Sequence, residues 1–596
     1  MKPLLGLVTE LRRRKTFRAA GIYIVAAWVA VQVASLVFPA VGLADSALLY
    51  VWLIVLFVFP LVIVFAWRYD VSAAGLTRTP PARADDDFDP SLRRTDYAII
   101  SVLAVVAISV SWQLTTRVEP MSEVVHAVVN PNSIAVLPFD NISGDPEQEY
   151  FTSGMQAALI SGLSRIRALR VTSKTSTLRY KNSDVTLAQV GRQLNISKVV
   201  EGSIFRFKNR VRLEVRLLDA EKDAHIWSAT FEDEIEDILV LQSRAAQAIA
   251  GQVRVMLSPD EQAQFDDPGR MNPAAYDAFL KGMFYVERFT PADFALAASY
   301  FQQAVELAPD HALPYWGLAK HCYFEAQNGE ITPAEAHEKC LPLNLKALDL
   351  DPLLPEAYLG YAAHMTWQQF DWDAAGVAFE RAIEINPSYA EARMFYSHFL
   401  TLTGDFESGW EQMRLALELD PLNPFVQALH GAQLFQSDRI EEAIEVTERV
   451  LAANPGFGFG DHILWMGYHE IGELDKSISA AAQVFRKHGY PNVADLLEQS
   501  YANGDYAGAL LETAAALEEL FKTTDLPPYP LTKLYELAGE VEKSIDWWEV
   551  CFRGRYPGMP YLVVETKSDA IRRHPRFIAL LRELELDYWA DKFSQP

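Results

Sequence analysis

The chain has few cysteines and lacks the short motifs of common catalytic sites. Three of its 596 residues are cysteine, too few for a disulfide framework. It contains no HExxH, GxSxG or CxxC sequence, and its twelve histidines are not spaced as metal ligands. We therefore predict no catalytic residue, no metal site and no cofactor, and we predict that the chain is not an enzyme.

Basic residues are scarce in the C-terminal half. Residues 265–596 carry 25 basic and 51 acidic side chains, a net charge of −26. Binding to nucleic acid needs clustered lysine and arginine against the phosphates, so we expect no nucleic-acid partner. An acidic surface of this kind keeps a protein soluble, and it also attracts basic partners.

The first 117 residues contain three long apolar segments without charge: residues 19–38, 47–67 and 97–114. Each is long enough to cross a hydrocarbon layer of roughly 30 Å. We predict a membrane anchor of three transmembrane helices; a pair of buried helices in a soluble protein is the alternative.

The distribution of lysine and arginine predicts the orientation of this anchor. Six lie before the first segment and five between the second and third, whereas the turn between the first two has none. Basic flanks stay in the cytoplasm. We therefore expect a multi-pass protein of a bacterial inner membrane, with a cytoplasmic N-terminus and everything after about residue 115 in the periplasm.

Residues 131–258 have the pattern of an α/β domain. SIAVLPF, from Ser133, reads as a buried strand, and apolar residues at helical spacing follow over residues 150–166. A second strand and a second helix follow, and the helix ends near Asn195. Three further strands come next, joined by turns at 208–209 and 221–223, and a helix over Ile238–Leu257 closes the domain.

The loop after the first strand raises the question of a phosphate site. It has neither the GxxxxGK[ST] nor the GxGxxG spacing, and its acidic residues would repel a phosphate. Asp145 and Pro146 instead predict a helix start. The alternative is a divalent-cation site formed by Asp140, Asp145 and Glu149.

Two segments resemble the TolB amino-terminal-like domain of bacterial envelope proteins: SIAVLPFDNISGDPEQEYFTSGM and VVEGSIFRFKNRVRLEVRLLDAEKDAHIW. The resemblance covers about 125 residues. It implies a non-catalytic α/β domain of periplasmic proteins, often followed by tetratricopeptide repeats. In that family the domain also follows winged-helix or adenylyl cyclase domains; this chain has neither at its N-terminus, so we do not expect those functions here.

Residues 272–590 contain a repeat. Prolines 309, 352, 387, 421 and 455 close similar segments, with spacings of 43, 35, 34 and 34 residues. A period of 34 residues resembles the tetratricopeptide repeat, in which two helices cross at small residues such as Ala375 and Ala382. We predict about seven repeats forming an all-α superhelix with a concave groove.

The repeat register places mostly apolar residues on the inner face of this groove. The expected protein-binding positions are Leu359, Ala363, Trp367, Met394, His398, Leu402, Ala428, Ala432 and Gln436. They suit an extended or helical partner segment with apolar side chains. Packing of these residues against neighbouring repeats is the alternative for each of them.

Cys322 and Cys340 fall midway along the two predicted helices of the long repeat. Two buried thiols are the favoured interpretation. A disulfide is the alternative, since two antiparallel helices would bring the cysteines together and a periplasm is oxidising. Cys551 has no obvious mate.

Together these features predict a membrane anchor, a central α/β domain and a C-terminal tetratricopeptide superhelix. The leading hypothesis is a periplasmic protein-binding scaffold or assembly factor of the cell envelope. The first alternative is a transmembrane signalling protein that acts through its short cytoplasmic segments. The second is a hydrolase that uses Asp140 or Asp145.

Overall fold

The computed structural model describes residues 129–595 apart from 267–268, 289–290, 328–329, 503 and 525, together with scattered positions between 23 and 65 and two short strands. The chain divides into two compact units, Met1–Ala127 and Val128–Pro596. In the first unit, β1 (Tyr69–Ser72) pairs with β2 (Gly75–Arg78) in an antiparallel hairpin.

The predicted membrane spans fall almost entirely outside the described residues: only isolated positions of 19–38 and 47–67 are described, and none of 97–114. Within the part of the chain that is described, no helix has both the length and the apolar character needed to cross a membrane.

The second unit begins with a six-stranded mixed sheet of order β5-β3-β6-β7-β8, with β4 paired to β6. Its parallel part consists of β3 (Ser133–Val136), β4 (Asp140–Asn141), β5 (Arg170–Val171) and β6 (Lys198–Phe207). β7 (Arg210–Asp219) and β8 (Ala224–Glu234) continue from β6 as an antiparallel meander. The three long strands predicted after Asn195 are confirmed.

Helices cover the two faces of this sheet unequally. On one face α5 (Glu149–Ser164) and α8 (Ile238–Gln252) pack on alternate residues of β7, beginning with Val211 and Leu213. On the other face α7 (Leu187–Leu194) covers Ala135 and Val199. The short helices η1 (Pro146–Gln148), α6 (Lys174–Leu178), η2 (Ile235–Asp237) and α9 (Pro259–Asp266) complete the domain.

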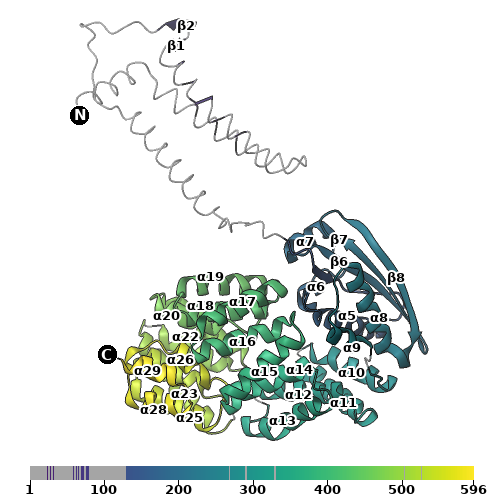
Figure 1. Cartoon of the computed structure of the whole chain (residues 1–596). Coiled ribbons are helices and arrows are strands. Elements are labelled where there is room, and N and C mark those ends of the chain that lie inside the picture. Colours follow the sequence, from purple (N-terminus) through teal and green to yellow (C-terminus); the bar gives the residue numbers. More distant parts are fainter. Residues whose placement is uncertain are drawn as a thin grey trace. The chain divides into compact units, whose positions relative to one another are not determined.

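The described residues of 273–553 form an all-helical repeat region (Figure 1). Its helices pack as eight successive pairs. The first four pairs are α10 (Pro273–Val286) with α11 (Pro291–Leu307), α12 (Ala312–Gln327) with α13 (Pro333–Leu350), α14 (Pro355–His364) with α15 (Trp372–Ile385), and α16 (Ala390–Thr403) with α17 (Phe406–Leu419). The last four are α18 (Pro424–Gln436) with α19 (Ile440–Ala453), α20 (Asp461–Glu470) with α21 (Leu474–Lys487), α22 (Pro491–Tyr501) with α23 (Tyr506–Phe521), and α24 (Tyr529–Leu537) with α25 (Val541–Arg553). α14 continues as the π-helix η3 (Met365–Gln369).

Small residues let the paired helices approach, as the sequence predicts. Ala375 and Ala382 are fully buried on α15. A Cβ atom on Gly409 of α17 would lie 3.0 Å from the Thr401 hydroxyl and 3.1 Å from the Ser397 carbonyl oxygen. Part of the 43-residue spacing has a local cause, because α13 is 18 residues long where α15 and α17 have 14.

The chain leaves the repeat pattern after Arg553, although the proline period predicts an array extending to residue 590. Residues Gly558–Ser568, which we call the closing segment, contain only η4 (Met559–Tyr561) and the short α26 (Leu562–Glu565). The closing segment contacts α16 and α18, which are far away in sequence. α27 (Asp569–Arg572), α28 (Pro575–Glu583) and α29 (Asp587–Ser594) follow it.

The α/β domain docks against the proline-containing turns of the array. Ser388, next to Pro387, donates its hydroxyl to the Leu169 carbonyl at 3.2 Å. Asp420, next to Pro421, accepts hydrogen bonds from the Ser176 amide at 3.1 Å and from its hydroxyl at 2.6 Å. Since Ser176 and Asp420 are both buried, these bonds hold the domain and the array together as one unit.

Candidate functional site

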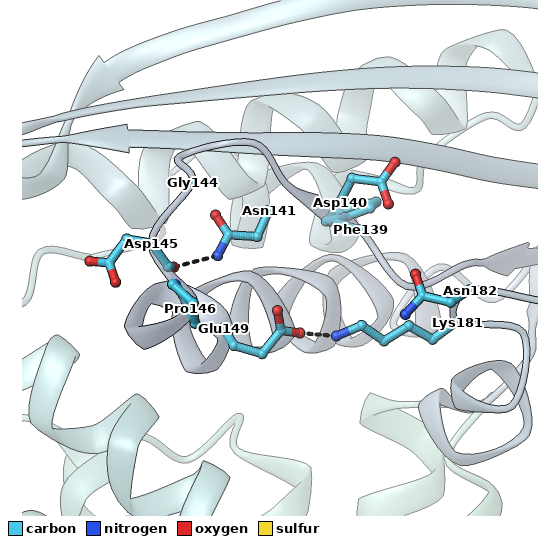
Figure 2. Close-up of a pocket in the computed structure, with 9 residues that line it drawn as sticks. All are labelled: Phe139, Asp140, Asn141, Gly144, Asp145, Pro146, Glu149, Lys181 and Asn182. Atoms are coloured by element: carbon cyan, nitrogen blue, oxygen red, sulfur yellow. Dashed lines mark hydrogen bonds and ion pairs between the residues drawn. The ribbon is translucent and has the colours of Figure 1, made fainter.

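The loop after β3 forms an open hollow of about 390 Å³ in the α/β domain (Figure 2). Asp145 starts η1 by accepting a hydrogen bond from the Glu147 amide at 2.9 Å, which confirms the predicted helix cap. The Asn141 side chain closes the loop by donating to the Asp145 carbonyl at 2.8 Å. The hollow is therefore framed by a turn and a cap.

The three carboxylates named for a cation site do not converge in this hollow. Glu149 pairs with Lys181, Asp145 is engaged in its cap, and Asp140 points in a different direction (Figure 2). Among the described residues, no three His, Cys, Asp or Glu side chains form a group that could hold a metal ion.

The predicted groove residues divide into two groups in the structure. Leu359 packs with Ala375 and Phe379 inside its own helix pair, and Met394 likewise packs with Met413 of its own pair. By contrast, three predicted groove residues lie against residues from far along the chain. The ring of His398 lies 6.2 Å from that of Tyr561, and Leu402 joins a core cluster with Leu562. The side-chain amide of Gln436 lies 3.5 Å from the Glu565 carboxylate. Tyr561, Leu562 and Glu565 all belong to the closing segment.

The remaining predicted groove residues are buried or half-buried within the array. Ala428 and Ala432 are buried in α18, and Ala363 is half-buried on α14. Trp367 is half-buried, with its ring centroid 5.5 Å from that of Phe395. His398, Leu402 and Gln436 therefore lie against a stretch of the same chain, the closing segment.

Apolar side chains anchor the closing segment. Met559, Leu562 and Val563 are fully buried, and Val564 is 1% exposed. They share a core cluster with Phe370 and Leu402 from the array. Burying apolar surface contributes about 25 cal/mol per Å², so this contact holds the segment firmly.

A buried polar cluster fixes the end of the segment. Glu565 accepts a hydrogen bond from the Tyr529 hydroxyl, and burial raises the pKa of its carboxyl, an effect that Lys533 opposes. Lys533 in turn pairs with Glu536 at 2.9 Å, with side chains 1% and 3% exposed.

Glu536 also receives the backbone of the closing segment. It accepts hydrogen bonds from the amides of Lys567 at 2.8 Å and Ser568 at 3.2 Å. The Lys567 ammonium then reaches across to donate to the Phe435 carbonyl at 3.0 Å. The segment is thus held between α24 on one side and α18 on the other.

The sequence prediction missed Lys533, Glu536 and the whole closing segment. One signal was available: Pro557-Gly558 interrupts the repeat pattern, and YLVVE then places a short apolar run before an acid. This signal marks a non-repeat segment, but nothing in it points to α16 and α18 as its contacts.

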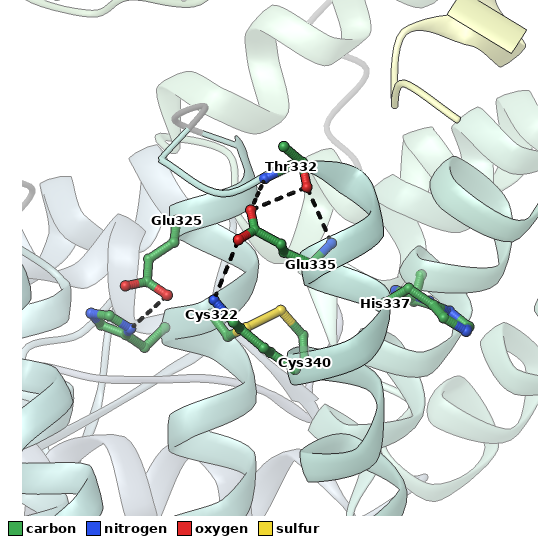
Figure 3. The surroundings of a disulfide bond; sticks show 9 residues. Cys322, Glu325, Thr332, Glu335, His337 and Cys340 are labelled. Atoms are coloured by element: carbon green, nitrogen blue, oxygen red, sulfur yellow. Dashed lines mark hydrogen bonds and ion pairs between the residues drawn. A yellow bond between two sulfur atoms is a disulfide. The ribbon is translucent and has the colours of Figure 1, made fainter. Parts of the chain in front are cut away.

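Cys322 of α12 and Cys340 of α13 form a disulfide in the structure, with Cα atoms 5.5 Å apart (Figure 3). The sequence favoured two buried thiols at these positions. α13 begins next to this bond with a capping box, in which Thr332 and Glu335 exchange hydrogen bonds. Cys551 is a free cysteine, and it is buried beneath the closing segment.

A family model matches the α/β domain. Residues 130–248 match the family model described as HilA/YgeH-like transcriptional regulator, second domain. The chain is 27% identical over 144 residues to the transcriptional regulator HilA of Salmonella typhimurium, covering 24% of this chain and 26% of that protein.

A protein of Rhizobium meliloti strain 1021, named putative adenylate cyclase 3, is 30% identical over 240 residues. The match covers 40% of this chain and 40% of the relative, so the chain spans two fifths of that protein's length. The prediction that the chain is not an enzyme is contradicted by this finding, because the relative's name is that of an enzyme.

The array is similar to a solved tetratricopeptide repeat protein of Thermus thermophilus, with 14% identity and a TM-score of 0.27. The match covers 36% of this chain and all of that one. A score of this size carries no argument about function, and the repeat architecture of this chain rests on its own helix pairs.

Proposed function

We propose that this protein is a protein-interaction scaffold of the bacterial cell envelope, with residues 1–117 as its membrane anchor and a TolB-like α/β domain and helical array in the periplasm. One observation carries the scaffold proposal: His398, Leu402 and Gln436, which the repeat register predicts on the inner face of the array, lie against a peptide segment of the same chain, the closing segment. Superhelices of stacked helix pairs present extended surfaces of this kind to partners.

Three exposed apolar side chains mark further contact surface on the array. Leu345, Val377 and Ile471 are 45%, 69% and 42% exposed. The acidic excess of residues 265–596 favours a partner with basic residues around an apolar contact.

Site-specific photo-crosslinking tests the scaffold. A photoreactive amino acid placed at Leu345, Val377 or Ile471 should give one or a few discrete crosslinked products in cells. The same amino acid at Phe207, exposed on the α/β domain, is the comparison position. If no array position gives a product above the background without irradiation, the scaffold proposal fails.

The placement in the envelope has its own test. Alkaline phosphatase, which is active only after export, would be fused after residues 130 and 596, with a cytoplasm-only reporter at the same sites. Phosphatase activity at both sites is expected from the basic flanks of the predicted spans. Activity of the cytoplasmic reporter alone would reverse the proposed orientation.

The relative from Rhizobium meliloti favours a second candidate function, nucleotide cyclisation. Purified protein incubated with ATP and Mg²⁺ or Mn²⁺ would be analysed for cyclic AMP by chromatography. Product above the level of heat-denatured protein would support this function, and none with either metal would count against it.

A further inference from the structure

The closing segment does not look like a ninth helix pair. It has a 3₁₀ turn and one four-residue helix, where every repeat helix is nine residues or longer. Residues 554–557 join it to α25; Gly554 and Arg555 are exposed, and Arg555 adopts a positive φ of 50°. The segment is thus an irregular stretch between α25 and α27 and not the next repeat.

Its contacts combine a strong apolar anchor with an imperfect polar fit. The apolar run Leu562–Val564 is buried to 1% or less. In contrast, the side-chain oxygens Gln436 Oε1, Gln368 Oε1 and Thr566 Oγ1 are buried along this contact without a protein partner. A buried oxygen left without a donor costs free energy, and a ligand that brings a donor to Gln436 Oε1 or Gln368 Oε1 of the array would recover it.

We propose that the closing segment is an internal ligand of the concave face, and that an external partner competes for the same face with a peptide of the same chemistry. That chemistry is an aromatic residue, three aliphatic residues and a carboxylate, as in Tyr561–Glu565. This inference rests on the proposed scaffold function and names the class of its partner.

Each part of the motif has its own receptor on the array. The aromatic ring is received by His398 of α16 and the aliphatic side chains by the cluster with Phe370 and Leu402. The carboxylate is received by the Tyr529 hydroxyl near Lys533. An entering peptide therefore needs the acid at the end of its apolar run, because a displaced carboxylate would leave Tyr529 and Lys533 without it.

The full-length chain supplies the reporter for a test. Cys551 is its free thiol and is fully buried in the cluster that the segment covers, and burial raises its pKa. A maleimide reacts with Cys551 only when the segment opens. The probe ligand is the synthetic peptide GMPYLVVETKS, which copies residues 558–568 and carries a fluorophore for anisotropy.

Two matched valine-to-alanine variants test how strongly the buried side chains hold the segment closed. Val564→Ala removes buried aliphatic surface and should raise both Cys551 labelling and peptide affinity about tenfold, because the closed state competes less well. Val377→Ala makes the same change at a side chain 69% exposed and should change either quantity less than twofold. A peptide with alanine in place of its glutamate should bind at least about tenfold more weakly.

The proposal stands if the peptide binds saturably, if it binds Val564→Ala more tightly, and if a scrambled peptide does not bind. It is overturned if Val564→Ala binds no peptide and Cys551 is labelled only at the rate of global unfolding, measured by circular dichroism. The segment would then be a permanent part of the core. Crosslinks at Leu345, Val377 or Ile471 would still be expected in that case, so the scaffold itself would survive.

Discussion

The α/β domain and the helical array bury their apolar surfaces in different ways. In the α/β domain, α5 and α8 cover the sheet from within about 120 residues of chain, in the order that the sequence predicts. In the array, the concave face around Leu402 is covered by Leu562, 160 residues later. The first arrangement follows from local pattern, whereas the second depends on how far the superhelix has turned.

The two regions also differ in their buried chemistry. The array contains the disulfide, the buried Lys533–Glu536 pair and His398, whose pKa burial lowers to about 4. The sheet of the α/β domain has ion pairs that are largely exposed, such as Arg210–Glu232. The array should therefore respond much more strongly to changes in charge, redox state and pH.

The largest effect is expected from Lys533→Met. The substitution leaves Glu536 buried without its partner, and breaking a buried pair costs about 3–5 kcal/mol. Arg449→Met is the matched control, because its pair with Glu445 is 66% and 63% exposed and should contribute within about 1 kcal/mol. Urea denaturation followed by circular dichroism measures both. Equal effects of the two substitutions would contradict the distinction between buried and exposed pairs.

Removing the disulfide should have the next largest effect. The bond closes a loop with a sequence separation of 18, and a loop of this size is worth about 3 kcal/mol. The double variant Cys322→Ser with Cys340→Ser should lose protection against hydrogen exchange in α12 and α13, while β7 keeps it. Adding a thiol reductant should reproduce the loss in the natural chain and have no effect on the variant. Equal loss in β7 would contradict the expected localisation.

Acid should weaken the array through His398. Because its folded pKa of about 4 lies below the ordinary value of 6.5, its contribution is complete above pH 6.5 and is lost as the pH falls towards 4. Between pH 7 and pH 5 this amounts to about 2 kcal/mol. His398→Gln keeps a donor for the Leu429 carbonyl and should reduce the loss by that amount. His225→Gln, at an exposed site on β8, should not reduce the loss of stability. A similar reduction there would contradict the assignment of this pH effect to His398.

Removing a helix cap should have the smallest effect, and its cost in stability should be the same in both regions. Asp405 caps α17 by accepting from the Ser408 amide at 3.1 Å, and Thr186 caps α7 through a capping box. Asp405→Ala and Thr186→Ala should each cost about 1 kcal/mol in thermal or urea unfolding, since caps act locally. A difference of several kcal/mol between them would show that one cap also supports tertiary contacts.

Sequence patterns predicted the elements that depend on neighbouring residues. The turns at 208–209 and 221–223 predicted the strands β6, β7 and β8, the proline period predicted the helix pairs, and Asp145-Pro146 predicted a helix start. Each of these signals extends over one turn, one strand or one helix pair. Local sequence is sufficient where the partners that satisfy a segment lie within the same short stretch.

The occupant of the concave face could not be predicted in the same way. The repeat register placed His398, Leu402 and Gln436 on the inner side, but it carried no information about the segment that meets them. That contact depends on the superhelical rotation accumulated from α16 to α24, which small changes in every helix crossing alter. Glu565 likewise became a buried carboxylate only because the chain folds back onto α24, where Tyr529 and Lys533 lie.

The sequence by itself therefore determined the order of the elements, the small residues at which helices cross and the acidic character of the array. These are properties of residues within one or two turns of each other or of composition alone. Only the tertiary structure decided that Ser176 meets Asp420 and that the closing segment fills the concave face. Such contacts join residues 129 or more positions apart, and their geometry is the sum of all the packing between them.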